Sequence, residues 1–154
     1  MIAINSVSSR TQLEAIERLF RDYAGSLGFD LEFQNFDTEL STLPGEYAPP
    51  GGDLLLAEAD GRAVGCVALR RISNDTCEMK RLYVKLAFRG RGAGRMLVTS
   101  IIDSARRLGY QRMLLDTVET MNEAIGLYYS FGFRETTPYR HNPIPGARFF
   151  ELRL

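Results

Sequence analysis

Hydrophobic and polar residues alternate with two different periods along this chain of 154 residues. Period-two alternation predicts strands over residues 2–7, 53–59, 62–72, 76–84, 112–117, 133–137 and 147–154. Helical spacing predicts a helix that ends at Gly28, helices over 92–108 and 120–132, and a weaker helix over 33–43. Residues 44–52 are rich in proline and glycine and predict a loop.

Polar motifs mark the starts of two predicted helices. Residues 9–12 or 11–14 fit a capping box before the first helix, and residues 120–123 fit another. The strands over 53–84 are separated by short turns, which is typical of an antiparallel meander. Since no repeat or linker divides the chain, we expect one α/β domain over residues 1–154.

Composition narrows the classes of function. Nineteen basic residues balance nineteen acidic ones, so we expect neither nucleic acid nor a membrane surface as a partner. Cys66 and Cys77 lie in apolar strands and are expected in the core, which fits a cytoplasmic protein. We expect no metal site, because His141 is the single histidine and no cysteine cluster accompanies it.

A glycine-rich turn lies between the predicted strand 76–84 and the predicted helix 92–108. Glycines bring backbone amides close to a phosphate, and a helix N-terminus attracts anions. The three arginines in the turn add positive charge suited to a diphosphate. Neither the P-loop nor the dinucleotide fingerprint matches, because Arg95 and Met96 follow Gly94 and the glycines recur every second residue. The turn consists of Arg89, Gly90, Arg91, Gly92, Ala93, Gly94 and Arg95.

Two motifs resemble those of the GCN5-related N-acetyltransferase (GNAT) family. The turn over 89–94 is similar to the family's Arg/Gln-x-x-Gly-x-Gly/Ala signature. Residues 122–133 carry the second hallmark, with Asn122, Leu-Tyr at 127–128 and Gly-Phe at 132–133 in the same order. The resemblance is specific over about residues 78–133.

This resemblance implies a mixed, mostly antiparallel sheet with about four helices and a central strand that splays from its neighbour. It implies that acetyl-CoA lies in the resulting gap, with its pantetheine arm bonded to backbone and its pyrophosphate on the amides of residues 90–95. The family transfers the acetyl group directly, without a covalent enzyme intermediate. The predicted cofactor-binding residues are Leu82, Tyr83, Val84, Arg89, Gly90, Arg91, Gly92, Ala93, Gly94, Arg95 and Asn122.

Glu78 is the predicted base. A protonated amine must lose a proton before it attacks a thioester, and a carboxylate inside a strand is uncommon. Period-two counting places Glu78, Lys80, Leu82 and Val84 on one face, and the resemblance implies a glutamate base here. The alternatives are an exposed edge glutamate paired with a neighbouring cation, and Asp116 or a water relay as the base.

Tyr128 is the predicted acid. A tyrosine can protonate the departing CoA thiolate, and Tyr128 holds the family's tyrosine position. A core aromatic is the alternative. Asn122 either bonds the cofactor arm or helps to cap its helix.

The acceptor is expected to be a primary amine, of a small molecule rather than a protein. The sequence offers two recognition hypotheses, acidic residues for a cationic amine or basic residues for a carboxylate. A sensor of acyl-CoA, a transferase of another acyl group and a binding module for another nucleotide diphosphate are the alternative functions, and a homodimer is compatible with the sequence. The acidic set is Asp30, Glu32, Asp37, Glu39 and Glu46, and the basic set is Arg134, Arg140, His141 and Arg148.

Overall fold

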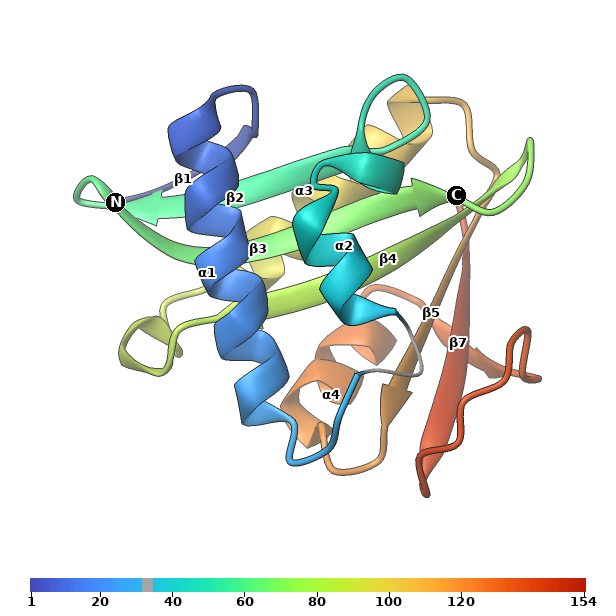
Figure 1. Ribbon diagram of the computed structural model, residues 1–154. Helices are drawn as coiled ribbons and strands as arrows, with labels where there is room; N and C mark the ends of the chain where they lie inside the picture. The colour runs from blue at the N-terminus through green and yellow to red at the C-terminus, as the bar shows by residue number, and fades with distance from the viewer. Residues whose placement is uncertain (32–34) are drawn as a thin grey trace.

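One sheet of seven strands organises the computed structural model, which describes residues 1–31 and 35–154 (Figure 1). The order across the sheet is β1-β2-β3-β4-β5-β7-β6. Neighbouring strands are antiparallel except β4 and β5, which run parallel. The strands are β1 (Ile2–Ser6), β2 (Asp53–Ala59), β3 (Arg62–Arg71), β4 (Thr76–Val84), β5 (Arg112–Val118), β6 (Arg134–Thr136) and β7 (Ala147–Arg153).

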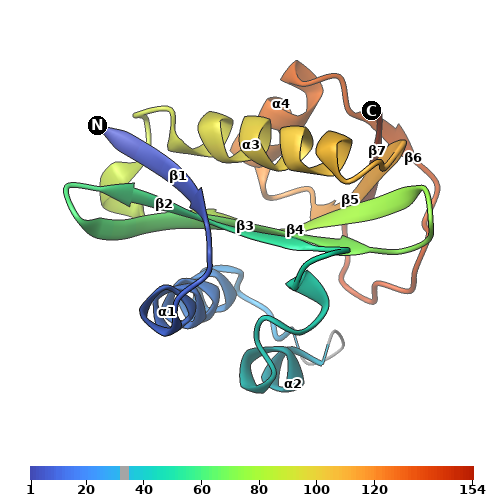
Figure 2. The same ribbon diagram turned by 90° about the horizontal axis from the view of Figure 1, so that it is seen from above.

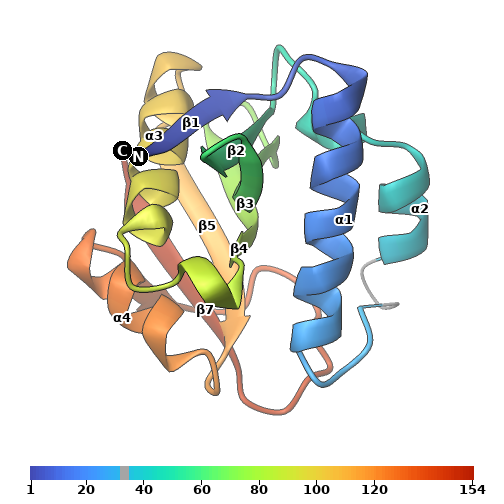
Figure 3. The same cartoon turned by 90° about the vertical axis from the view of Figure 1, so that its left-hand side faces the viewer.

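Four α-helices cover the sheet in the described ranges: α1 (Arg10–Ser26), α2 (Phe36–Ser41), α3 (Ala93–Arg107) and α4 (Asn122–Ser130). Helices α1 and α2 lie on one face, and α3 and α4 lie on the other (Figures 2 and 3). The predicted fold class, a mostly antiparallel sheet with four helices, is confirmed. None of the helices outside residues 32–34 is long and apolar enough to cross a membrane.

The start of α1 confirms one capping prediction. Ser9 is the N-cap, its hydroxyl accepts from the backbone of Gln12 at 3.1 Å, and Gln12 Oε1 accepts from the backbone of Ser9 at 3.0 Å. The prediction of a capping box at 120–123 is wrong. The backbone N–H of Met121 donates to the carbonyl of Val118 at 2.9 Å, and this turn delays the helix so that Met121 becomes its N-cap.

The segment between α1 and β2 differs in detail from its prediction. The weak helix predicted over 33–43 corresponds to α2 from Phe36, while its predicted start at residue 33 lies outside the described residues. The predicted loop 44–52 contains a short 3-10 helix, η2 (Gly45–Tyr47). A second 3-10 helix, η3 (Leu86–Phe88), follows β4.

Two hydrophobic cores lie on the two faces of the sheet. One packs α3 and α4 against the sheet and contains Cys77, and the other packs α1 against it and contains Cys66. Both cysteines are free and fully buried, as predicted. Burial raises the pKa of the Cys77 thiol to about 12 and that of Cys66 further, so both thiols stay protonated.

Candidate active site

Strands β4 and β5 begin side by side and then diverge. Their parallel pairing ends at Glu78 and Leu114, after three residue pairs, and Figure 1 shows the strands separating beyond that point. The opening, which we call the gap, is a small cavity of about 40 Å³. Its lining includes Lys80, Leu82, Asp116 and Tyr128. The predicted splayed strand pair is therefore present.

A β-bulge in β4 changes which side chains face the gap. Arg81 has a φ of 62°, and the register against β3 shifts opposite it, between Cys66 and Ala68. Before the bulge, Lys80 pairs with Ala68 on the α1 face, whereas Leu82 and Val84 pack against the core on the α3 face. The prediction that Glu78, Lys80, Leu82 and Val84 share one face is wrong, because the extra residue inverts the alternation.

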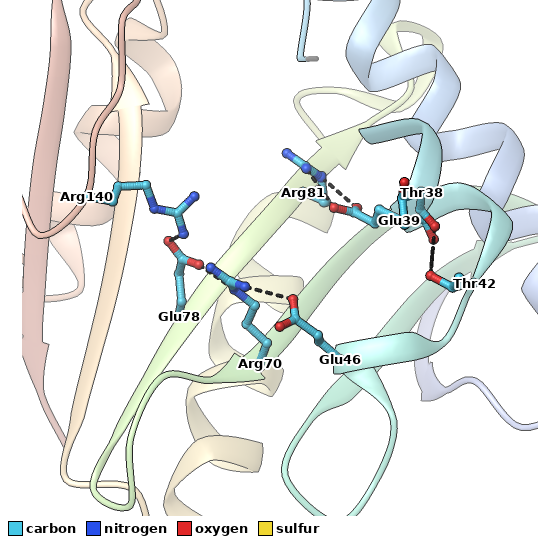
Figure 4. Close-up of polar contacts among 8 residues, drawn as sticks. All are labelled: Thr38, Glu39, Thr42, Glu46, Arg70, Glu78, Arg81 and Arg140. Carbon is cyan, nitrogen blue, oxygen red and sulfur yellow. Dashed lines mark hydrogen bonds and ion pairs between the residues drawn. The ribbon is translucent and has the colours of Figure 1, made fainter. Parts of the chain in front are cut away.

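Arg81 is held in this unusual conformation by contacts on the α1 face. Its Nε and Nη2 donate to the two carboxylate oxygens of Glu39 at 2.9 and 2.8 Å. The guanidinium also lies over the rings of Tyr23 and Phe36, at 5.9 and 5.3 Å. Figure 4 shows this ion pair connecting α2 to the splayed strand. Since Arg81 is only 4% exposed, the bulge is anchored by a buried ion pair.

A larger groove of about 690 Å³ runs from the end of β4 across the glycine-rich turn to α4. This volume falls within the range of small-molecule and cofactor sites. All but one of the predicted cofactor-binding residues line it: Leu82, Tyr83, Val84, Arg89, Gly90, Gly92, Ala93, Gly94, Arg95 and Asn122. The exception is Arg91, whose guanidinium lies over the ring of Phe88 at 5.4 Å and which lines a different, smaller pocket.

The glycine-rich turn presents the N-terminus of α3 to the groove. Gly90 and Gly92 have φ values of 81° and 83°, which favour glycine strongly, and Gly92 is the N-cap of α3. No side chain caps this helix, so its first backbone N–H groups can donate to a bound anion, and the positive end of the helix dipole would attract that anion. Arg89 and Arg95 are exposed, and they hydrogen-bond the Val84 carbonyl and the Ser130 hydroxyl.

Glu78 is the buried centre of a polar cluster, which we call the Glu78 network and define as Glu46, Arg70, Glu78, Tyr139 and Arg140. Arg70 donates to Glu78 at 2.7 Å and to Glu46 at 2.7 Å. Tyr139 and Arg140 both donate to the other oxygen of Glu78. Figure 4 shows the contact with Arg140. Glu78 is 0% exposed, so it is not the exposed edge residue considered from the sequence.

The electrostatics of the network keep Glu78 ionised. Burial alone would raise the pKa of this carboxyl, but the positive charges of Lys80, Arg140 and Arg70 outweigh burial and lower it. Glu78 lines neither the gap nor the groove. The residue predicted as the base is therefore a carboxylate beside the gap with both oxygens hydrogen-bonded.

Tyr128 and Asp116 both line the gap. Tyr128 is 6% exposed, and burial raises the pKa of its hydroxyl above the ordinary value. Its ring packs against Phe133, with centroids 5.6 Å apart. The carboxylate of Asp116 accepts a hydrogen bond from Asn142 Nδ2 at 3.1 Å. Two of the residues proposed from the sequence for proton transfer therefore lie at one cavity.

Four of the charged residues proposed to meet the acceptor form ion pairs with other residues of the protein. Glu39 binds Arg81, and Glu46 binds Arg70. On the basic side Arg140 binds Glu78 and Arg148 binds Glu135 at 2.8 Å. Glu32, also in the acidic set, lies outside the described residues. Glu39, Glu46, Arg140 and Arg148 are therefore engaged in ion pairs within the protein.

Lys80 and Tyr23 lie at the site but were not predicted from the sequence as site residues. Tyr23 lines the gap, the groove and a third small pocket next to Asn142. Lys80 lines the gap and is 8% exposed. A lysine within a predicted strand interior was the available signal, because lysine is almost never fully buried. Outside residues 32–34, no group of three or more His, Cys, Asp or Glu could hold a metal ion.

Comparison with known proteins agrees with this geometry. An uncharacterized N-acetyltransferase of Schizosaccharomyces pombe is 43% identical over 99% of this chain and 95% of its own length. A GNAT-family acetyltransferase of Staphylococcus aureus has the same fold, with a TM-score of 0.80, 21% identity and 99% coverage of both chains. A GNAT acetyltransferase of Elizabethkingia anophelis, solved with acetyl-CoA bound, gives a TM-score of 0.71 at 21% identity, covering 99% of this chain and 98% of its own.

The family model described as the acetyltransferase (GNAT) family matches residues 13–133. This match includes both motifs and all the lining residues of the gap and the groove. The predicted family and the predicted enzyme class, an acetyl-CoA-dependent N-acetyltransferase, are confirmed by the match and by the relatives. The chain belongs to the GNAT family of acetyltransferases.

Proposed function

We propose that residues 1–154 act as one domain that transfers the acetyl group of acetyl-CoA directly to a primary amine of a small molecule. The observation that carries this proposal is the continuity between the groove and the gap. Their linings share Tyr23, Leu82, Met121 and Ala124, so a ligand held along the groove can reach the gap with one end. Acetyl-CoA supplies a thioester at such an end, and an amine can attack it.

The residues along the groove fit the parts of acetyl-CoA. The uncapped amides at the start of α3 suit the pyrophosphate. The backbone at Leu82 and Val84, beyond the bulge, suits the amide groups of the pantetheine arm. From Glu78 to Val84 is roughly 20 Å of extended strand, comparable with an extended pantetheine arm. Asn122 on α4 lines the opposite wall.

Direct transfer is supported by the cysteines. A covalent acyl intermediate on sulfur would require a thiolate near the thioester. Cys66 and Cys77 are fully buried in the two cores, line neither the gap nor the groove, and have thiol pKa values raised by burial. Each cysteine is accounted for by packing, which leaves the amine itself as the proposed nucleophile.

Tyr128 is proposed to protonate the leaving thiolate. Because burial raises its pKa, the hydroxyl is protonated at neutral pH and carries a proton that it can donate to the departing sulfur. Its position in the lining of the gap supports this role. The neighbouring Tyr129 does not line the gap. It is 49% exposed, and its hydroxyl accepts a hydrogen bond from Arg148 at 3.0 Å.

Glu78 and Asp116 are the carboxylates proposed from the sequence to take the proton of the amine. Asp116 lines the gap and Glu78 does not. Matched variants test both residues, because Glu78→Gln and Asp116→Asn each remove a charge and keep the shape. If either carboxylate is the base, its amide variant should lose turnover at every pH.

The first experiment measures CoA release when purified protein and acetyl-CoA are mixed with a panel of primary amines. We expect amine-dependent release, an N-acetylated product by mass spectrometry, and a loss of about 10²-fold or more in Tyr128→Phe. Tyr129→Phe is the matched control and should keep its rate. Tight acetyl-CoA binding without release on any amine would contradict the proposal and favour an acyl-CoA sensor.

A further inference from the structure

Lys80 is a buried amine in the gap that the proposed mechanism has not used. It lies on β4, paired with Ala68 on the α1 face, one residue before the bulge. It lines the same cavity as Asp116, Leu82 and Tyr128, and it is 8% exposed. A long cationic side chain normally extends its charge into water, so a lysine this buried requires an explanation.

Among the described residues, the charges that act on Lys80 are predominantly positive. Burial and the charges of Arg81, Arg140 and Arg70 disfavour its protonated form, while Glu78 favours it. These effects together lower the pKa of Lys80 to about 7, so a large share of the side chain is the neutral amine near neutral pH. Within residues 1–31 and 35–154, the charged or titratable groups around it include Glu78 and Arg81 from β4, Arg70 from β3, Asp116 from β5, Tyr23 from α1, Tyr128 from α4 and Arg140 from the C-terminal loop.

We propose that Lys80 is the group that takes the proton from the acceptor's ammonium in the gap, and that Glu78 tunes Lys80 instead of taking this proton itself. The inference rests on the proposed function. Lys80 lines the gap and Glu78 does not, while both oxygens of Glu78 already accept hydrogen bonds within the Glu78 network. A neutral lysine accepts a proton through its nitrogen lone pair, as a general base of suitable pKa requires.

The proton and bond changes balance with these residues. The acceptor ammonium gives one proton to Lys80 Nζ, and the resulting amine forms a bond to the thioester carbonyl carbon. The bond from that carbon to sulfur breaks, and the sulfur leaves with the electron pair and takes the proton of the Tyr128 hydroxyl. The new amide nitrogen loses its second proton to the Tyr128 phenolate. Lys80 then releases its proton to solvent, so one acetylation yields one CoA thiol and one free proton.

The first test reads the protonation of Lys80 directly. The chain has two lysines, Lys80 and Lys85, so protein labelled with ¹³C at lysine Cε gives two side-chain signals. Lys85→Arg removes one signal and assigns the other. We expect Lys80 to titrate near pH 7, far below the ordinary lysine value of about 10.4. A Lys80 side chain whose signal shows it still protonated at about pH 9 would overturn the proposal.

The second test measures turnover in lysine variants. Lys80→Arg keeps the positive charge but cannot act as a base near neutral pH, and Lys80→Met removes the nitrogen. We expect both to lose kcat by about 10²-fold or more while binding acetyl-CoA as the wild type does. Lys85→Arg and Lys85→Met are the controls, because Lys85 lines neither the gap nor the groove.

The outcomes separate this proposal from the proposed function. Turnover in Lys80→Arg within about threefold of the wild type would overturn Lys80 as base and leave the acetyltransferase intact. Absence of transfer to any amine in the wild type would overturn both. Glu78→Gln gives an independent readout, since loss of its charge lowers the pKa of Lys80 and should move the acid limb of the pH–kcat profile to lower pH. If Glu78→Gln loses rate at every pH without that shift, Glu78 and not Lys80 is the base, and the proposal is overturned.

Discussion

Replacing Glu39 by glutamine tests the idea that a buried ion pair holds the bulge of β4. Glu39 on α2 accepts two hydrogen bonds from Arg81, which lies in the bulge with a φ of 62°. In Glu39→Gln one carboxylate oxygen becomes an amide that points a donor at the guanidinium. Arg81 then keeps its charge in a buried site without a neutralising partner.

The expected loss of stability follows from the burial of the ion pair. Removing one partner of a buried pair typically costs about 3–5 kcal/mol. The side chains of Arg81 and Glu39 are 2% and 16% exposed, so solvent screens the pair weakly. The rings of Tyr23 and Phe36 still attract the guanidinium, which places the expected loss at the lower end, about 3 kcal/mol. For a chain of this size that loss lowers the melting temperature by about 6–12 °C.

Urea unfolding and thermal melting measure this loss. The control is Glu17→Gln, which removes an exposed pair with Arg21 at 3.2 Å on α1 and should cost about 0.3–0.5 kcal/mol. A loss below about 1 kcal/mol in Glu39→Gln would refute the reasoning, because the pair would then behave like an exposed one. Measuring acetyl-CoA affinity in the same variant shows whether a relaxed bulge also weakens the groove.

Three further predictions concern the backbone and the pH dependence of stability. In Gly65→Ala the new Cβ would lie 2.8 Å from the Tyr83 carbonyl oxygen, so urea unfolding should show a loss of about 1–3 kcal/mol in stability. Gly126→Ala, on the exposed side of α4, is the contrast and should increase stability by about 0.5–1 kcal/mol. Gly92→Ala should cost about 1–2 kcal/mol, because of its φ of 83°, and should weaken acetyl-CoA binding by calorimetry; unchanged affinity would argue against an anion site at α3. The Glu78 carboxyl has a lowered pKa in the folded state, so its charge stabilises the fold above the unfolded pKa, and this stabilisation is lost as pH falls. The difference in stability between the wild type and Glu78→Gln should therefore shrink below about pH 4. A difference that stays constant with pH would contradict this prediction.

The elements defined by short-range sequence signals were predicted well. The capping residues Ser9 and Gln12 set the start of α1, and the spacing of apolar residues in 92–108 predicted α3. The glycine-rich turn was also predictable, because positive φ at Gly90 and Gly92 is a local property of the residue type. The capping box at 120–123 failed, since a turn fixed by Val118 and Met121 competed with it.

Charge partners could not be predicted in the same way. Glu46 and Arg70 are 24 residues apart, and Glu78 and Arg140 are 62 apart, so the fold alone brings them together. Glu46 and Arg140, which the sequence suggested as ligand-binding charges, are therefore paired with other charges of the protein. The bulge at Arg81 had a similar effect, because it moved Glu78 and Lys80 to the face opposite Leu82.

The sequence by itself determined the family, because two local motifs identify it, and the sheet with its helices, because these follow from local periodicity. Tertiary structure decided the neighbours of Glu78 and placed Lys80 in the gap beside Asp116 and Tyr128. The physical reason is that proton affinity depends on burial and on charges contributed by several separate elements. No local pattern records those distances, so the chemistry of the gap emerges only when β3, β4, β5 and the C-terminal loop pack together.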